Sequence, residues 1–185
     1  MILRLIQAHF LVLLNMNCPL SKLLGCAMHH FPPISQDSTL RSMSSSRIIL
    51  ATDHAGYPLK EVLKQYLQGE GVDTVDIGVF SEDPVDYPEI MRRGAAAVLE
   101  YGCPGIFLGG SGNGEAMAAN KVRGIRAAVV WSEETAKLAR AHNDANVMCL
   151  GGRLIKPELA KKCVDIFLST EFEGGRHEKR VKDLE

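Results

Sequence analysis

The strongest signal in this chain is the stretch Ile106-Phe107-Leu108-Gly109-Gly110-Ser111-Gly112-Asn113-Gly114-Glu115. Three apolar residues predict a buried strand, and the four glycines after them predict a turn whose backbone N–H groups come close to a ligand. The helix-forming segment 116–121 follows directly, and its first turn adds unpaired N–H groups and a partial positive charge. Strand, glycine-rich turn and helix in this order suit an anion-binding site.

A carboxylate at the end of this turn distinguishes it from a plain phosphate cradle. Glu115 stands where a bound sugar or phosphate would be within reach, so we interpret it as a candidate base. The alternative is a tight connection in which Glu merely favours the first helical turn. The turn lacks the G-x-x-x-x-G-K-[ST] pattern, and it does not follow the first strand, so neither nucleotide hydrolysis nor dinucleotide binding is indicated.

The same alternation of strand and helix runs from Arg47 to the C-terminus. Apolar runs predict strands at residues 48–51, 72–77, 106–108, 125–130 and 147–150. Helical spacing predicts helices at residues 59–67, 90–99, 115–122, 133–141 and 157–168, with a further helix near the C-terminus. Strands without polar alternation are typical of a parallel sheet covered on both faces. The predicted fold is therefore α/β: a doubly wound, five-stranded parallel sheet in a three-layer sandwich of the Rossmann or flavodoxin kind.

Charge and cysteine usage limit the partners. A net charge of −1 gives no general attraction to nucleic acid or to a membrane, so an anionic ligand must be held by a local cluster. The five cysteines form no C-x-x-C pair, so neither a zinc site nor a disulfide framework is indicated. Cysteines in or beside apolar runs suggest buried thiols in a reducing compartment, and we expect a cytoplasmic protein.

Residues 1–46 differ in composition from the predicted domain at 47–185. They contain a short apolar start, turn-forming residues and few acidic residues. Three interpretations remain open: an organellar transit peptide, a weak secretory signal, or an upstream extension that is unused because translation starts at Met43 rather than Met1. The apolar start is too short to span a bilayer convincingly.

Polar residues follow the predicted strands, at the sheet edge where open α/β proteins bind ligands. They include Asp53, His54, Tyr87, Ser111, Glu115 and Arg153, and we place with them His142 and Asn143, which end the helix after the fourth strand. Arg176 and Arg180, four residues apart, share a helix face and could clamp one phosphate. The sequence predicts that all these groups collect at one edge. Each also has a plainer interpretation, as a helix cap, a helix end or a solvated surface.

Seven short motifs occur in a fixed order between about residues 47 and 180. They are Asp53-His54-Ala55-Gly56, Asp86-Tyr87-Pro88, Gly110-Ser111-Gly112-x-Gly114, Ala118-Ala119-Asn120-Lys121, His142-Asn143, Gly152-Arg153 and Gly174-Gly175-Arg176-His177. Together they resemble the ribose-5-phosphate isomerase B family, which includes allose-6-phosphate and galactose-6-phosphate isomerases. Many members carry a cysteine base at the position of Gly109. This chain resembles the subgroup that places a glutamate at Glu115 instead.

The resemblance implies interconversion of ribose 5-phosphate and ribulose 5-phosphate through a cis-enediolate, without metal or cofactor. Glu115 would be the base, and Ser111 would relay a proton between two substrate oxygens. His142 would open the sugar ring, and Asp53 would orient the hydroxyls. Phosphate binding is expected at His54, Arg153, Arg176 and Arg180, and other substrate contacts at Tyr87, Gly110, Gly112, Asn113, Gly114 and Asn143.

Other functions remain open at this stage. One is a hexose 6-phosphate isomerase of the allose or galactose type, and another is a non-catalytic phosphosugar-binding module. A phosphate-accepting receiver domain has the same fold, but it would need an Asp where this chain has Gly109. The resemblance further implies a homodimer, or a dimer of dimers, whose active sites are shared between subunits.

Overall fold

Five parallel strands form the centre of the structure, a computed structural model in which residues 47–185 are described. The strands are β1 (Arg47–Thr52), β2 (Asp73–Asp76), β3 (Gly105–Gly109), β4 (Ala127–Val130) and β5 (Val147–Gly151). Their order in the sheet is β2-β1-β3-β5-β4, and every neighbouring pair is parallel. We call the edge at which these strands end the carboxyl edge, and the edge at which they begin the amino edge.

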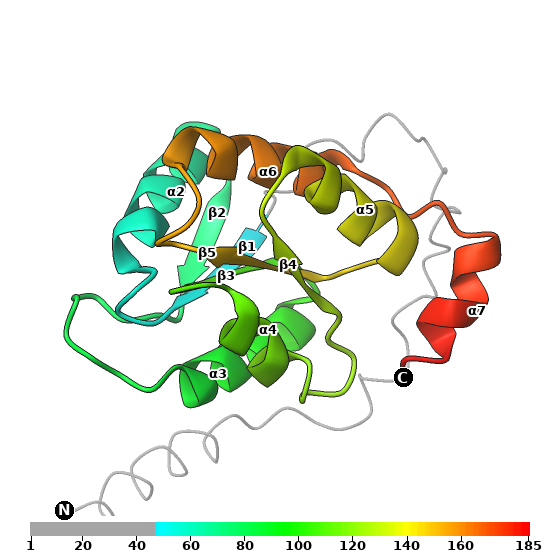
Figure 1. Ribbon diagram of the computed structural model, residues 1–185, viewed down its shortest axis with the longest axis horizontal. Helices are drawn as coiled ribbons and strands as arrows, with labels where there is room; N and C mark the ends of the chain where they lie inside the picture. Colours follow the sequence, from blue (N-terminus) through cyan, green and yellow to red (C-terminus); the bar gives the residue numbers. More distant parts are fainter. Residues whose placement is uncertain (1–46) are drawn as a thin grey trace, which may run out of the picture. The chain divides into compact units, whose positions relative to one another are not determined.

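Helices cover both faces of the sheet, as Figure 1 shows. One face carries α2 (Tyr57–Gly69), α5 (Glu133–Asn143) and α6 (Pro157–Ser169), and the other carries α3 (Tyr87–Tyr101) and α4 (Asn113–Ala119). A short helix, α7 (Arg176–Lys182), lies outside the sandwich beside the end of α5, in red in Figure 1. The doubly wound, three-layer fold and the C-terminal helix are thus confirmed.

The core consists of two apolar layers, one on each face of the sheet. Along β1, Ile48 and Leu50 face the layer of α2, α5 and α6, whereas Ile49 and Ala51 face α3. Full burial of one such aliphatic side chain contributes about 1.5–3 kcal/mol relative to exposure. Because both faces are covered, the central strands need no polar alternation, which explains their continuous apolar runs.

The predicted strands at residues 72–77 and 125–130 are shorter in the structure, where their first residues do not belong to the sheet. The backbone N–H of Val72 donates to Leu67 O (2.9 Å) and closes α2, so β2 begins at Asp73. Before β4, the N–H of Ile125 donates to Val122 O (3.1 Å) in a turn. Local hydrogen bonds therefore remove these apolar residues from the sheet.

In doubly wound sheets, ligands bind where neighbouring connections diverge, and in this fold that point lies at the carboxyl ends of β1 and β3. The helices that follow these neighbouring strands, α2 and α4, lie on opposite faces of the sheet. The two connections therefore diverge and leave space between them. No helix within residues 47–185 has the length and apolar character needed to cross a membrane. The interpretations of residues 1–46 lie outside the described part of the chain.

Candidate active site

The glycine-rich turn is seated tightly on the end of β5. Gly112 has a φ of 83°, in the left-handed region, and precedes the first residue of α4. Gly151 lies beneath the turn, and a Cβ added there would come within 2.9 Å of Ser111 O. The N–H of Gly152 donates to Gly109 O (2.7 Å). The backbone of Gly151 and Gly152 thus holds the glycine-rich turn in place.

Glu115 lies in the first turn of α4, and its side chain reaches back over Gly109. A Cβ at Gly109 would overlap the Glu115 carboxylate, so only glycine leaves room for it. The residue is 4% exposed, and its Oε2 has no hydrogen-bond partner among the described residues. A buried carboxylate oxygen without a partner is costly, which makes Glu115 a candidate functional group.

Burial raises the pKa of Glu115 above its usual range. Hydrogen bonds from backbone N–H groups oppose the rise in pKa, and the charge of Asp53 adds to it. Desolvation therefore raises the pKa of Glu115 by more than the backbone hydrogen bonds at the start of α4 lower it. The sequence alone could not decide the direction of this shift. A carboxylate with a raised pKa is a stronger base near neutral pH.

Asp53 and His54 follow β1, the strand next to β3. Asp53 is buried, and its Oδ1 accepts hydrogen bonds from the N–H groups of Ala55 (2.9 Å) and Gly56 (3.1 Å). It thus stabilises the turn before α2, although the N-cap residue of that helix is Gly56 and no side chain caps it. The Nδ1 of His54 accepts from the N–H of Val85 (3.3 Å), so the proton of the neutral ring is on Nε2.

Tyr87, Ser111 and Arg153 complete the carboxyl-edge group. A Cβ on Gly114 would lie 2.7 Å from the Tyr87 hydroxyl oxygen, so the tyrosine packs directly on the turn. Ser111 is exposed, and its Oγ accepts from the N–H of Asn113 (3.3 Å). The Arg153 Nη1 lies 4.0 Å from the Cβ position of Gly110. Carboxylate, hydroxyl, imidazole and guanidinium groups are therefore all present at the carboxyl edge.

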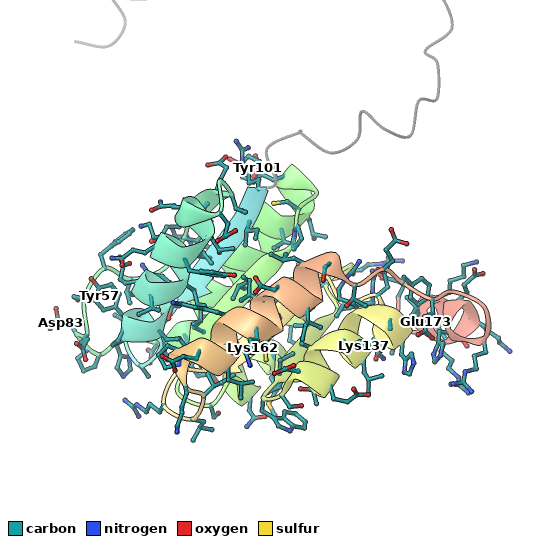
Figure 2. The ribbon with its side chains drawn as sticks, turned by 90° about the horizontal axis from the view of Figure 1, so that it is seen from above. Tyr57, Asp83, Tyr101, Lys137, Lys162 and Glu173 are labelled. Atoms are coloured by element: carbon teal, nitrogen blue, oxygen red, sulfur yellow. The ribbon has the colours of Figure 1, made fainter. Side chains whose placement is uncertain are left out.

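His142, Asn143, Arg176 and Arg180 do not belong to this group, and the prediction of a single cluster within one chain is wrong. The helix α5 returns antiparallel to the strands, so its last residues, His142 and Asn143, lie at the amino edge. The two edges are separated by the length of β3, five residues or about 16 Å. Figure 2 shows Asp83, before α3, and Glu173, before α7, at opposite ends of the domain.

The residues at the amino edge contact one another. We call His142, Asn143, Glu173, Arg176, His177 and Arg180 the amino-edge group. The rings of His142 and His177 stack with centroids 4.3 Å apart and planes 7° apart. The Nε2 of His142 is 3.5 Å from Glu173 Oε2, and the Nε of Arg176 donates to the Nε2 of His177 (3.2 Å). A cavity of about 330 Å³ is lined by His142, Asn143, His177, Arg180, Val181 and Leu184.

His177 was missed as a site residue, although it stands beside Arg176 in a quoted motif. It is buried, and burial lowers its pKa, helped by the charges of His142, Arg176 and Arg180. The feature of the sequence that could have identified His177 was its position next to Arg176, in the first turn of α7. The packing of His177 on His142 could not be predicted, because it joins two elements that are distant in the sequence.

The amino-edge group suits an anion better than a metal ion. The side chains of His142, Glu173 and His177 bring three potential ligand atoms within 4.8 Å of one another. However, the rings are parallel, so their in-plane lone pairs do not converge on one point, and the Nε2 of His177 already accepts from Arg176. Positive charge from two neighbouring arginines also disfavours a cation.

Asp144 fixes the end of α5 next to this group. Its φ is 44°, which makes it the single non-glycine residue of segment 47–185 with a positive φ. The carboxylate accepts from Arg126 Nη2 (2.8 Å) and from Arg140 Nη1 (2.9 Å). The Nε of Arg126 donates to Asp144 O (2.9 Å), and its Nη1 donates to Glu185 Oε1 (2.9 Å), which ties the residues after α7 to the same corner.

Comparison with known proteins connects this geometry to a family. A family model described as Ribose/Galactose Isomerase matches residues 48–184. Ribose-5-phosphate isomerase B of Mycobacterium leprae is 46% identical over 145 residues, which cover 77% of this chain and 90% of that protein. A solved ribose 5-phosphate isomerase from Thermotoga maritima is 47% identical, with a TM-score of 0.74 over 75% of this chain and 97% of its own. Ribose-5-phosphate isomerase B from Mycoplasma genitalium, solved with bound ribulose-5-phosphate, is 40% identical, with a TM-score of 0.72 over 76% of this chain and 94% of its own.

Proposed function

Because this chain belongs to the ribose/galactose isomerase family, we propose that it interconverts ribose 5-phosphate and ribulose 5-phosphate. The observation that carries the proposal is the buried carboxylate of Glu115, which has one oxygen without a partner and lies over a glycine turn. The relatives in Mycobacterium leprae and Mycoplasma genitalium bear the name of this activity. The three free thiols of the described domain, Cys103, Cys149 and Cys163, support a reducing location such as the cytoplasm.

In the proposed reaction, one proton moves between C2 and C1 of the open-chain sugar. Glu115 takes the proton from C2 of the aldose, and the electron pair of that bond forms the C1=C2 double bond of the enediolate. The negative charge then lies on O1, where backbone N–H groups of the turn from Gly110 to Gly114 stabilise it. Glu115 returns its proton to C1, and Ser111 moves a proton between O2 and O1, which gives the ketose.

We assign Asp53 to the sugar hydroxyls, Tyr87 to the wall of the sugar pocket, and His54 and Arg153 to the phosphate. His54 donates from Nε2, because its Nδ1 already accepts from Val85. Arg153 presents a permanent positive charge beside Gly110, with no carboxylate within ion-pair distance among the described residues. These groups bind the substrate from one side only.

We further propose that the amino-edge group of a second copy covers the other side. A site that contains both Glu115 and His142 cannot form within one chain, since the two lie at opposite edges of the sheet. A two-fold dimer would bring His142, Asn143, Arg176 and Arg180 of each copy over the carboxyl edge of the other, and would create two equivalent sites. There, His142 would open the ring and the two arginines would bind the phosphate.

Exposed apolar residues beside the turn support this dimer. Trp131 and Leu154 are 65% and 76% exposed, and Met117 projects from the outer face of α4. A cavity of about 650 Å³ next to the turn is lined by Ser111, Asn113, Val129, Val130, Trp131, Gly151, Leu154, Ile155, Lys156 and Leu159. Large apolar side chains gathered at a polar site are typical of a surface that a partner covers.

The test is a steady-state assay of the full chain with ribose 5-phosphate and, separately, with allose 6-phosphate. We expect faster turnover of the pentose, and a loss of about 10²–10⁴ in kcat in Glu115→Gln, the usual contribution of a general base. Glu158→Gln is the matched control, because Glu158 also lies in a first helical turn but is exposed. Near-normal turnover by Glu115→Gln would refute the mechanism, and preference for the hexose would refute the substrate.

A further inference from the structure

Lys60 is one of the largest fully buried side chains of the described domain, with 0% exposure. It lies in the first turns of α2, and its backbone N–H donates to Gly56 O (2.9 Å), directly after the turn that holds Asp53 and His54. Burial of an ammonium group is costly unless charges and acceptors compensate. A lysine in this position therefore calls for a reason beyond filling space.

Most of the compensating contacts lead to the end of β2 and the loop after it, and one further acceptor, Glu61 Oε1 at 3.0 Å from the Lys60 Nζ, lies on α2 itself. The Nζ of Lys60 is 2.8 Å from Asp76 Oδ2 and donates to Val79 O at 2.9 Å. It also lies over two aromatic rings, 4.8 Å from the centroid of Phe80 and 5.1 Å from that of Tyr57. Phe80 stays largely exposed, so its contact with the ammonium group, rather than burial, holds it in place.

This loop, residues 77–86, connects Lys60 to His54. Its first residues are fixed to β1, because the N–H groups of Ile77 and Val79 donate to Leu50 O (2.8 Å) and Thr52 O (3.2 Å). Near its other end, the N–H of Val85 donates to the Nδ1 of His54 (3.3 Å). The loop that Lys60 contacts at Val79 thus also donates the hydrogen bond that the Nδ1 of His54 accepts.

We infer that Lys60 is a positioning residue that, through the 77–86 loop, holds His54 with its Nε2–H directed to the substrate. The inference rests on the proposed function, in which His54 binds the phosphate. Lys60 acts at the start of the loop by holding Val79 and Phe80, and Val85 transmits that position to the imidazole. Without the anchor, the Val85 contact loosens, and His54 samples both neutral tautomers.

Lys64 provides a matched control within the same ion-pair cluster. Its Nζ also contacts Asp76 Oδ2 at 2.8 Å, but the side chain is 26% exposed and its sole side-chain hydrogen bond in the described structure is to Asp76. Lys64→Met therefore removes one charge from the cluster and leaves the loop anchor intact. Lys60→Met removes a charge of the same sign together with the bond to Val79 O and the contact with Phe80.

The experiment follows the full chain, labelled with ¹⁵N-histidine, by NMR, with His54 assigned through His54→Asn. We expect His54 to show only the Nε2-protonated neutral form in the unmodified chain and in Lys64→Met, and a tautomer mixture in Lys60→Met. With ribose 5-phosphate, Lys60→Met should raise KM about 10-fold, the effect of one weakened hydrogen bond to a charged group, and change kcat less than about 3-fold.

Retention of the single His54 tautomer and of KM in folded Lys60→Met would overturn the inference. If Lys60→Met does not fold, Phe80→Ala, at an exposed position, should shift the tautomer and KM in the same direction, and no shift there would overturn it as well. The NMR result does not require turnover. Absence of activity in the unmodified chain would therefore refute the proposed function separately from the positioning role of Lys60.

Discussion

The carboxylate of Glu115 fills the space that any side chain at Gly109 would occupy. A base at position 109 and a glutamate at position 115 are therefore sterically exclusive in this geometry. The two residues are six positions apart, and the turn folds one over the other. Which of the two positions could carry a base therefore depends on the residues at both.

Gly109→Ala should abolish most of the activity without unfolding the protein. The added methyl group would push the Glu115 carboxylate from its place over the turn, and we expect kcat for ribose 5-phosphate to fall by about 10², the lower range for loss of a general base. Gly69→Ala is the control, because nothing lies within 4 Å of a Cβ at that helical position. Normal kcat in Gly109→Ala would show that Glu115 does not act from its observed position.

Glu115→Gln should stabilise the folded domain at neutral pH. Because burial raises the folded pKa above the unfolded one, the unfolded chain loses this proton first, and stability falls as pH rises from about 4.5 to the folded pKa. The amide variant does not ionise and avoids this loss. Thermal melts at several pH values should show equal Tm near pH 4 and a higher Tm for Glu115→Gln at pH 7. A lower Tm at pH 7 would contradict the raised pKa.

Mixing two inactive variants should restore activity if the sites are shared. Glu115→Gln removes the base from one edge, and His142→Asn removes the ring-opening group from the other. In a mixed dimer, one site contains both variants and the other contains neither. With random re-association, half of the dimers are mixed, so about a quarter of normal activity should return. No recovery after confirmed subunit exchange would refute the shared site.

Arg176→Ala should act mainly on substrate binding. Loss of one charge-assisted hydrogen bond to phosphate costs about 1.5–3 kcal/mol, which corresponds to a rise in KM of about 10- to 150-fold, with kcat changed much less. Arg92→Ala serves as control, since Arg92 is an exposed arginine paired with Glu89 on α3. An unchanged KM for Arg176→Ala would remove α7 from the phosphate site.

The carboxyl-edge site could be predicted from the sequence because local patterns determine it. Asp53 and Arg153 lie within two residues of a strand end, and Tyr87 begins the helix that follows β2, so a parallel sheet brings them to the same end whatever the details of packing. His142 was misplaced because it ends a helix rather than a strand, and helices in this fold return to the opposite edge. Its contact with His177, and the buried position of Lys60, depend on long-range packing that no local pattern contains.

The separation of Glu115 and His142 along the axis of β3 has a kinetic consequence. If each working site needs two chains, a lone chain is a substrate-binding fragment with no turnover of its own. Specific activity should then decline on dilution below the dissociation constant of the pair, and recover on concentration. Cellular flux through the reaction would follow chain abundance more steeply than in proportion, so the enzyme would respond sharply to changes in its own expression.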